Sequence, residues 1–518
     1  MKLMKILYIL TILLLTSSCD EFLEEDPPNF LDPNLAYETE EDVFQALVGA
    51  YDLLGSGSQD YYKRRFLYMV NFASDEMDPV DLAADVPLHD FSFTANDNNI
   101  SRTYQNIYQA IAATNAVIAN VGNVSGLSTE KANQLEGEAR FLRALHHFNA
   151  LRLWGDIVIQ ENLVSDLSQT NRPRDPVSNV YEFVIDDLIF ARDNIAPANE
   201  NGRATSGAAA ALLAKVYLTR AGSDVAEDGD YQACVDACNQ VINSNIYALT
   251  DDFEKAIGKE DAFNSESIFE FFTTRGGPTG NGELSIWGVF VLPVNAWTDD
   301  IDFAGINPDY ADQSPTIGTA DIVSEEVFFN LFDARDYRRE MSFVYRGTDS
   351  EGDSIGYDSF ARTFPHCPQK FIDASNPGDR SGYSFSANIM ILRYADVILM
   401  KAEALNELNN LDGAVTELNK IRTRARNGDG TGPWGETGFP ENLSVTLGQD
   451  GLREAILNER AIELAFEGHR WFDLARTNRL ISTLQSQGKA IQEKHQLFPI
   501  PDSQTRLKDT QIEQNPGW

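Results

Sequence analysis

The residue types that most often carry catalysis or bind metal ions form no chemical site in this sequence. Six histidines are present, but none stands in an HExxH or other metal-ligand spacing, and no two cysteines form a CxxC pair. No phosphate-binding loop occurs. With 79 acidic residues, carboxylate pairs of the kind that hydrolyse glycosides arise by chance and decide nothing. We therefore expect no enzyme, no metal-ligand residues and no cofactor, while the binding of a structural metal ion stays open.

Cys19 is the residue to which the sequence assigns a chemical role. Lys2 and Lys5 precede the apolar run Ile6–Leu15, and the small residues Thr16–Ser18 follow it. A basic start, a short apolar run and small residues are typical of an export signal. Because the small residues end on a cysteine, we predict a bacterial lipoprotein signal, cleaved before Cys19 and acylated on its thiol. Several acyl chains would anchor the protein stably. The alternative is an ordinary cleaved signal with an incidental cysteine.

The other three cysteines are not expected to form a disulfide framework. Cys234, Cys238 and Cys367 are odd in number, so at least one must be free. Cys234 and Cys238 stand four residues apart on a predicted helix, where the separation and orientation suit a disulfide poorly. We predict that both are small buried residues on the core face of that helix.

The composition excludes one class of partner. The chain has 518 residues, 43% of them apolar, as in ordinary globular proteins, and 41 basic against 79 acidic residues give a net charge of −38. Nucleic-acid binding needs a basic surface, so it is not expected. Such an excess of charge favours solubility. After the N-terminal run, no apolar stretch reaches the roughly twenty residues of a membrane-spanning helix.

Helical periodicity dominates the chain and predicts four pairs of helices. The predicted pairs are Glu41–Leu54 with Ile100–Val121, Lys131–Trp154 with Val180–Ile195, Gly207–Ala221 with Tyr231–Asn243, and Ile389–Leu408 with Asp412–Ala425. In the last pair Ile391, Ala395, Ile398, Ala402 and Leu405 fall on one helical face. Recurring pairs with small residues at packing points predict a mostly α, tetratricopeptide-like array of irregular period. A helical bundle is the alternative.

The domain organisation follows from the remaining segments. Residues 1–18 are predicted to be the signal peptide and residues 19–40 an acidic, proline-containing tether. Residues 41–518 are predicted to form one domain. Within it, residues 244–388 form a loop-rich insertion with short strands such as Ser267–Phe272, and residues 451–518 a C-terminal block that begins with a helical stretch over Gly451–Gln485.

The C-terminal block contains an unusual density of opposite charges. Glu459, Glu463 and Glu467 alternate with Arg460, Arg470 and Arg476, and the apolar residues Leu464, Phe466, Trp471 and Phe472 lie among them. Charges three or four residues apart on a helix can pair, but this set cannot all pair in sequence. We interpret it as a partly buried ionic network that positions the C-terminal helix against the array, and not as a catalytic group.

This block resembles the signature of the SusD/RagB family, the surface glycan-binding lipoproteins of Bacteroidota. The stretch from Glu459 to Arg476 (ERAIELAFEGHRWFDLAR) is similar to the family pattern ER-x-x-EL-x-x-EG-x-R-x-x-DL-x-R over its whole length. Leu392–Ala404 (LRYADVILMKAEA) is similar to a second family motif. The ending, with Leu497–Pro501 and Gln514–Trp518, and the start, with Asp20 and Glu21 after Cys19, also resemble family members.

The resemblance implies a function and a partner. Such a lipoprotein would sit on the outer membrane, facing the cell exterior, as a lid on a SusC-like TonB-dependent transporter. It would hold an oligosaccharide and pass it to that transporter. Sugar rings present apolar C–H faces to aromatic side chains, while their hydroxyls need polar partners. The implied ligand residues are therefore loop aromatics accompanied by polar side chains.

Two groups of residues fit that description. Phe91, Phe93 and Asn96 match an aromatic-x-aromatic-x-x-Asn segment of the starch-binding family member, although both aromatics are Phe and not Trp. They could instead be alternating core residues of a short strand. Trp287, Trp297 and Tyr310 stand in the loop-rich region, accompanied by Asp299, Asp300 and Asn307; here the alternative is packing beneath the loops. Trp434 in the glycine-rich segment 427–438 could contact ligand, stabilise its own loop or meet the partner.

Two other functions remain open. A helical-repeat surface can serve as a protein–protein scaffold without binding any sugar. A glycoside hydrolase is the less favoured alternative. Tryptophan fluorescence that responds to oligosaccharide would distinguish a glycan receptor from a scaffold, and release of new reducing ends would indicate an enzyme.

Overall fold

The fold is known from a computed structural model of the whole chain, in which a defined set of segments is described. These are residues 37–55, 61–164, 171–200, 202–257, 263–271, 301–303, 321–344, 346–349, 354–356, 366–370, 388–426, 438–507 and 510–518. The predicted signal peptide with Cys19, and most of the tether, lie outside them. No helix in these segments is long and apolar enough to cross a membrane.

Eight helices form the four predicted pairs, and all begin and end within four residues of the predicted bounds except one. They are α2 (Glu40–Asp52), α5 (Asn98–Val121), α6 (Thr129–Trp154), α7 (Val177–Asn194), α8 (Ser206–Ala221), α9 (Asp230–Asn243), α14 (Tyr394–Glu407) and α15 (Leu411–Arg426). Local capping explains several starts: the side chains of Thr39, Asp97, Ser128 and Thr205 accept hydrogen bonds from backbone N–H groups in the first turn.

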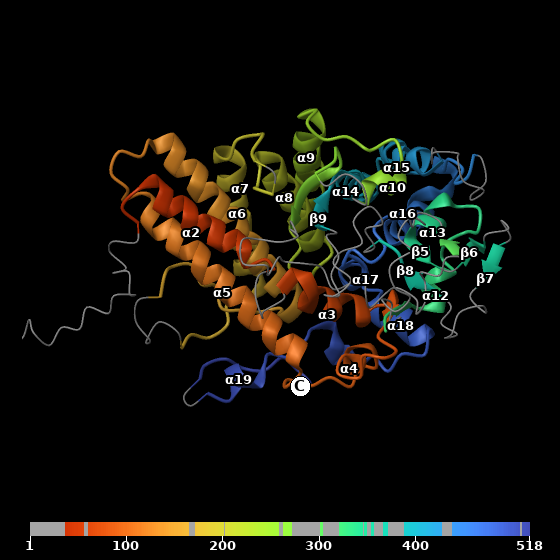
Figure 1. The fold of residues 1–518 in the computed structure, drawn as a ribbon, viewed down its shortest axis with the longest axis horizontal. Coiled ribbons are helices and arrows are strands. Elements are labelled where there is room, and N and C mark those ends of the chain that lie inside the picture. The colour runs from red at the N-terminus through yellow and green to blue at the C-terminus, as the bar shows by residue number, and fades with distance from the viewer. Residues whose placement is uncertain are drawn as a thin grey trace, which may run out of the picture.

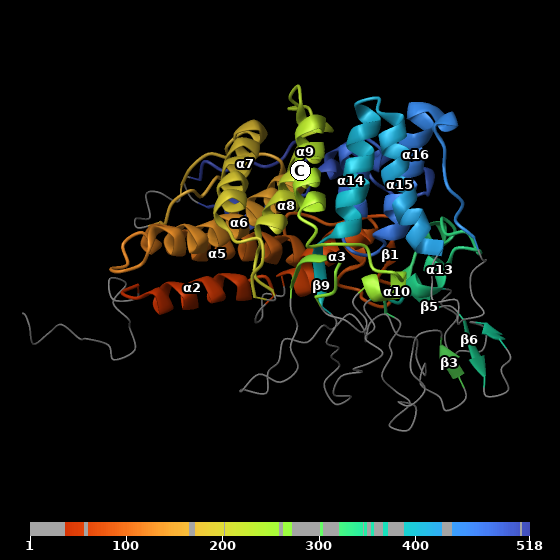
Figure 2. The same cartoon turned by 90° about the horizontal axis from the view of Figure 1, so that it is seen from above.

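The helices stack as predicted. α2 packs on α5, α6 on α7, α8 on α9 and α14 on α15, and α6–α9 also contact one another in sequence order. Figures 1 and 2 show the row running from α2, α5, α6 and α7 through α8 and α9 to α14, α15 and α16 (Gly448–Glu463). The mostly α, tetratricopeptide-like prediction is confirmed.

The start of the fourth pair was predicted wrongly as helix. Residues Ile389–Arg393 form strand β9, and α14 begins only at Tyr394. Strand β9 pairs antiparallel with β2 (Ser267–Phe271). Ile391 therefore belongs to the strand and not to the helical face that Ala395, Ile398 and Ala402 share. A short apolar run satisfies either period, and the backbone partner that decides between them is far away in sequence.

The loop-rich region is held by short antiparallel strand pairs. Strand β1 (Met77–Asp78) pairs with β4 (Val323–Ser324) and β5 (Phe343–Val344) with β8 (Cys367–Pro368), and the three strands β3 (Ile301–Phe303), β6 (Arg346–Asp349) and β7 (Ser354–Gly356) form one sheet in the order β3-β6-β7. Short helices accompany them: α10 (Phe253–Ala256), α12 (Glu326–Phe329) and α13 (Tyr337–Ser342). The predicted strand at Ser267–Phe272 is present as β2.

The C-terminal block contains three successive helices where the sequence suggested one helical stretch. They are α16, α17 (Arg470–Arg476) and α18 (Leu480–Ser486). The break after α16 includes Phe466 at φ 67° and Gly468 at φ 78°. A Cβ added at Gly468 would lie 2.8 Å from Leu67 Cδ2, so glycine is required both by the backbone conformation and by the close approach of this turn to the N-terminal unit.

Periodicity did not reveal one buried segment. Residues Tyr61–Arg65 form a π-helical turn that continues into α3 (Phe66–Phe72), and every residue of α3 is buried. A helix buried on all sides lacks the polar face that makes a helical period visible in sequence. Short helices α4 (Val86–His89) and α19 (Asp502–Thr505) and 3-10 turns at Val445–Leu447 and Glu493–Gln496 complete the described elements.

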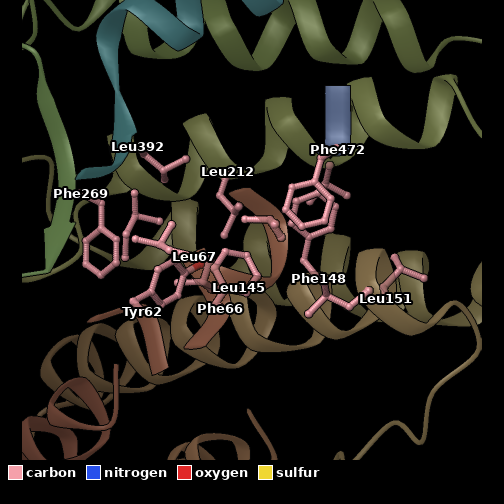
Figure 3. Close-up of a cluster of buried hydrophobic side chains, with 14 of the residues drawn as sticks. Tyr62, Phe66, Leu67, Leu145, Phe148, Leu151, Leu212, Phe269, Leu392 and Phe472 are labelled. Atoms are coloured by element: carbon pink, nitrogen blue, oxygen red, sulfur yellow. The ribbon is translucent and has the colours of Figure 1, made fainter. Parts of the chain in front are cut away.

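The hydrophobic core contains side chains from the helical array, from the N-terminal segment before α5 and from the C-terminal block. Figure 3 shows Tyr62 and Phe66 against Leu145 and Phe148 of α6, with Leu212 of α8 and Phe472 of α17 on the opposite side. Phe269 of β2 and Leu392 of β9 lie at one edge of the same cluster. Cys234, Cys238 and Cys367 are buried and take part in no disulfide bond among the described residues, as predicted for the first two.

Candidate functional site

The predicted aromatic platform lies outside the described residues. Trp287 and Trp297 stand between β2 and β3, and Tyr310 between β3 and β4. Asp299, Asp300, Asn307 and Trp434 are outside them as well. The described strands therefore give the points where these segments leave and rejoin the framework, and the role of the aromatic side chains stays a prediction.

Phe91 and Phe93 are described, and both are buried. Their side chains are 6% and 4% exposed, and their ring centroids lie 6.2 Å apart. The Phe91 ring stacks on Trp471 at 6.5 Å, and the Phe93 ring stacks on Trp518 at 5.2 Å. Both also contact His495, at 5.3 and 5.4 Å. Because other aromatic rings cover Phe91 and Phe93, their faces are not available to a sugar, and both residues belong to the core.

Asn96 differs from its two aromatic neighbours because it is exposed. It stands just before Asp97, whose side chain caps α5 by accepting hydrogen bonds from the N–H groups of Asn99 and Ile100. Asn96 donates its own backbone N–H to Thr94 Oγ1 at 3.3 Å. Of the three residues matched to the starch-binding segment, Asn96 is therefore the one that a ligand could reach.

The charged residues of the C-terminal block form buried ion pairs, centred first on Glu463. We call Glu463 with Arg338, Arg393 and Arg424 the Glu463 cluster. Arg393 Nη1 lies 2.8 Å from Glu463 Oε1, Arg338 Nη1 lies 3.1 Å from Oε2, and Arg424 contacts Oε1 as well. Glu463 is fully buried. Burial alone raises the pKa of Glu463, but the three guanidinium groups outweigh it and hold that pKa well below its usual range.

Further carboxylates surround this cluster and balance its arginines. Glu459 Oε1 accepts from Arg338 at 2.6 Å, and Glu266 accepts from Arg393 at 3.2 Å. Glu467 Oε2 accepts from Arg393 at 2.8 Å, while its Oε1 accepts from Lys370 Nζ at 2.8 Å. Against the opposing effect of burial, these two cations lower the pKa of Glu467 to about 2. The network ties β9, α13 and α15 to α16.

A second group of buried pairs centres on Asp396 of α14. Lys215 Nζ of α8 lies 2.8 Å from Asp396 Oδ2, and Arg460 Nη1 of α16 lies 2.9 Å from Oδ1. Arg460 Nε also donates to Asp473 Oδ2 of α17 at 2.8 Å. Asp396 thus joins two helices of the array to the C-terminal block. Arg460 does not pair with Glu463, although the two share a face of α16.

A third contact joins the C-terminal block to the N-terminal unit. Arg470 donates from Nε and Nη2 to both carboxylate oxygens of Asp75, each at 2.8 Å. Glu76 Oε1 accepts the N–H of Phe466 at 2.8 Å, and Asn71 Nδ2 donates to the carbonyl of Phe466 at 3.0 Å. Burial raises the pKa of Glu76 to about 8. The predicted structural role of the signature charges is therefore confirmed.

These pairs are poorly suited to acid–base catalysis. A carboxylate held ionised by two or three guanidinium groups can neither deliver nor collect a proton near neutral pH. One further pattern, G-x-S-x-G, occurs at Gly352–Gly356. Its Ser354 belongs to strand β7, which pairs antiparallel with β6, whereas a nucleophile elbow places the serine in a turn between strand and helix.

One cluster of potential metal ligands was not visible in the sequence. Asp78 of β1, His89 of α4 and Glu325 after β4 offer ligand atoms within 4.8 Å of one another. His89 Nε2 lies 2.6 Å from Glu325 Oε1, and Lys489 Nζ lies 2.6 Å from the same oxygen. The lysine supplies the positive charge that a metal ion would bring, so the geometry is that of an ion-pair cluster. Residues 78, 89 and 325 are too far apart in sequence to suggest it.

Comparison with known proteins agrees with the fold and with the C-terminal block. A family described as "SusD family" matches residues 239–518, and one described as "Starch-binding associating with outer membrane" matches residues 21–218. SusD-like protein P2 of Formosa agariphila is 30% identical over 541 positions, covering 100% of both chains.

Solved structures show the same fold. A SusD homologue of Bacteroides thetaiotaomicron has a TM-score of 0.77 at 22% identity, covering 94% of this chain and 98% of its own. A laminarin-binding SusD-like protein has a TM-score of 0.72 at 23% identity, covering 93% of this chain and 100% of its own. The "SusD family" match spans more than half of the sequence, the P2 relative covers all of it, and the signature charges occupy buried positions in the fold. The chain belongs to the SusD/RagB family.

Proposed function

We propose that this protein captures an oligosaccharide at the outer surface of the cell, anchored through acylated Cys19, and passes it to a SusC-like TonB-dependent transporter. Membership of the SusD/RagB family is the observation that carries the proposal. The match to a family described as starch-binding and associating with the outer membrane supports both the ligand class and the location. The laminarin-binding relative of the same fold supports a glycan ligand.

The ligand site that we propose is formed by Trp287, Trp297 and Tyr310. These residues stand in segments that have no helical or strand period to bury them, in contrast to Trp154 and Trp471, which lie on helices and are 0% and 1% exposed. Aromatic faces in such segments suit the C–H faces of sugar rings. Asn96, exposed at the start of α5, is the polar residue of the framework that we assign to the same ligand.

A rigid framework fits this role. The strands from which these segments leave belong to the domain core: Phe269 and Phe271 of β2 are buried, and Val323 and Ser324 of β4 are buried as well. Binding residues are commonly found on loops that a rigid scaffold positions. Capture without catalysis needs no more than such a surface, and the neighbouring cations hold Glu463 and Glu467 ionised, which leaves these two carboxylates unsuited to acid–base chemistry.

The test is titration calorimetry on the Cys19→Ala chain, a form designed to stay soluble. A glycan array first identifies the glycan, with laminarin oligosaccharides and maltooligosaccharides as named probes. Trp287→Ala and Trp297→Ala should then each cost about 1–3 kcal/mol of affinity, by analogy with stacking on other aromatic platforms. Their effect on stability should stay within about 0.5 kcal/mol, as for surface positions. Val48→Ala removes an exposed apolar side chain of α2 and is the control, which should change neither affinity nor stability.

Three results would contradict parts of the proposal. Unchanged affinity together with a large drop in melting temperature would show that both tryptophans are packing residues. Binding to no glycan on the array would leave the scaffold alternative in place of glycan capture. New reducing ends released from a bound glycan would show that the protein is an enzyme.

A further inference from the structure

A cleft of about 660 Å³ lies where the array meets the C-terminal block, away from the predicted aromatic platform in sequence. It is bounded by the end of α6, the start of α7, the turn after α8, the end of α17 and the last residues of the chain. The lining residues on which the argument depends are Leu151, Arg152, Val177, Tyr181, Val225 and Phe472. Its volume is that of a small-molecule or short-peptide site.

The walls of the cleft beside Phe472 are apolar, whereas the acidic residues that line it, Asp156, Asp224 and Glu493, are exposed to solvent. Figure 3 shows Phe472 of α17 next to Phe148 and Leu151 of α6, which together form one end of the labelled cluster. The turn after α8 approaches α17 so closely that a Cβ added at Gly222 would lie 2.3 Å from the carbonyl oxygen of Arg476. Any larger residue at position 222 would push the two sides of the cleft apart.

Arg152 is partly exposed and lines both this cleft and a smaller cavity beside Tyr62 and Phe66. Its guanidinium carbon is 3.8 Å from the ring centroid of Phe472 and 4.2 Å from that of Phe148. Among the described residues its hydrogen bond is from Nη2 to Asn149 Oδ1, at 2.5 Å, and its Nε is buried without a partner. No ion pair between described residues includes Arg152, and the charge of Asp473 acts on it only at longer range.

Neighbouring arginines, in contrast to Arg152, pair with carboxylates. Arg143 on the same helix lies 2.7 Å from Asp187, Arg220 near the same cleft lies 2.6 Å from Asp230, and Arg476 donates to Glu403 at 2.8 Å. A cation withdrawn from water is costly unless an anion compensates it. Two aromatic faces compensate Arg152 only in part. Burial lowers the pKa of Arg152 to about 10, so it remains charged at neutral pH.

We propose that this cleft binds the C-terminal end of a peptide, with the terminal carboxylate on Arg152 and an apolar last side chain against Val177, Tyr181 and Phe472. A guanidinium group is the preferred partner of a carboxylate, which it can hold through two hydrogen bonds. Capture of a peptide carboxylate is a known mode of recognition. An acidic sugar is less suited to the part of the cleft beside Arg152, because Val177 and Phe472 there offer its hydroxyls no hydrogen-bond partner.

The first test uses matched peptides on the Cys19→Ala chain. Acetyl-Ala-Leu-Phe with a free carboxylate and the same peptide with a C-terminal amide are titrated by calorimetry. A hydrogen bond to a charged group contributes roughly 1.5–3 kcal/mol. The free acid should therefore bind about 10- to 100-fold more tightly than the amide. Equal affinity for both, or no binding of the acid at millimolar concentration, would overturn the proposal.

Variants locate the site. Arg152→Gln should abolish the preference for the acid over the amide. Because Arg152 also packs on two rings, Val177→Trp provides a second variant, which fills the cleft from its rim and should weaken both peptides at least tenfold. Arg172→Gln removes an exposed arginine of the loop before α7 and should change neither affinity. Loss of the acid preference in Arg172→Gln would place the site elsewhere.

Galacturonate is the third probe and separates an acidic sugar from a peptide. Binding of galacturonate that requires Arg152, with no binding of the peptide acid, would show that the cleft is a sugar-acid site and would contradict the peptide proposal. None of these outcomes bears on Trp287 and Trp297, so failure here and failure of the proposed glycan capture are distinguishable.

Discussion

Removing the charge of Glu463 should lower the free energy of unfolding substantially, because this carboxylate pairs with three buried arginines. In Glu463→Gln the side chain keeps its size, but Arg393 loses its 2.8 Å partner, Arg338 its 3.1 Å partner, and Arg424 its contact with Oε1. All four side chains are 3% exposed or less. Breaking a buried pair by removing one partner typically costs about 3–5 kcal/mol, because the remaining charge is uncompensated.

The remaining carboxylates set the size of the loss. Glu459, Glu266 and Glu467 still face the three arginines, so we expect a cost of about 3–5 kcal/mol and not the sum of three such costs. A domain is stable by roughly 5–15 kcal/mol, so this is a large fraction of the total. Urea denaturation followed by circular dichroism gives the free energy of unfolding, provided that the m-value is unchanged.

Glu454→Gln is the matched control on the same helix. Glu454 is 52% exposed in its side chain and pairs with Arg479, so the same substitution should cost between about 0 and 1 kcal/mol. If Glu463→Gln costs no more than Glu454→Gln, the network does not hold the C-terminal block and our interpretation of the family signature is refuted.

The pH dependence of the same pair has a definite sign. The pKa of Glu463 is depressed in the folded state, so its contribution is fully present above the unfolded pKa of about 4.3 and is lost as pH falls through the folded value. The difference between wild type and Glu463→Gln should therefore persist at pH 5 and shrink only in stronger acid. A difference that vanishes between pH 7 and pH 5 would contradict this.

Three further predictions concern other parts of the chain. Cys19→Ala should move the protein from the membrane fraction to the soluble fraction, because the acylated thiol is its anchor; retention of the variant in membranes, or its labelling by fatty acid, would show otherwise. Phe93→Ala should cost about 3–5 kcal/mol in urea denaturation and leave glycan affinity unchanged, because the ring is buried; loss of affinity without loss of stability would instead support the sugar-stacking prediction. His89→Gln should lower the melting temperature more at pH 5.5 than at pH 9. Burial lowers the pKa of His89, but its hydrogen bonds with Glu325 and Asp90 and the charge of Asp78 raise the pKa overall. The histidine therefore stabilises the fold below about pH 6.5 and loses that effect as pH rises through the folded pKa. Equal loss at both pH values would mean that the protonated ring adds nothing to stability.

The helices of the array were predictable because their causes are local. A side-chain period of 3.6 residues, the capping residues Thr39, Asp97, Ser128 and Thr205, and small residues at packing points all lie within each helix. The density of opposite charges predicted the structural role of the C-terminal block, and the family resemblance then identified this block as a signature. The burial of Cys234 and Cys238 followed from helical spacing alone.

What depends on distant partners could not be predicted in this way. Residues Ile389–Arg393 are a strand because β2, more than a hundred residues earlier, supplies their backbone partners. Arg460 pairs with Asp396 and Asp473 and not with its helical neighbour Glu463, because those carboxylates come from α14 and α17. In each case the local sequence is compatible with two structures. The one that forms is determined by contacts with a segment distant in sequence, which lies nearby only in the folded chain.

Two of the predicted ligand residues are covered by other side chains. Phe91 and Phe93 match a ligand-binding spacing, but Trp471, His495 and Trp518 cover their rings, and these residues come from the far end of the chain. Residue type and spacing indicate which ligand a side chain is able to bind. Whether a ligand can reach the side chain depends on its solvent exposure. Exposure depends on the tertiary structure, because residues distant in sequence fill the space beside the side chain.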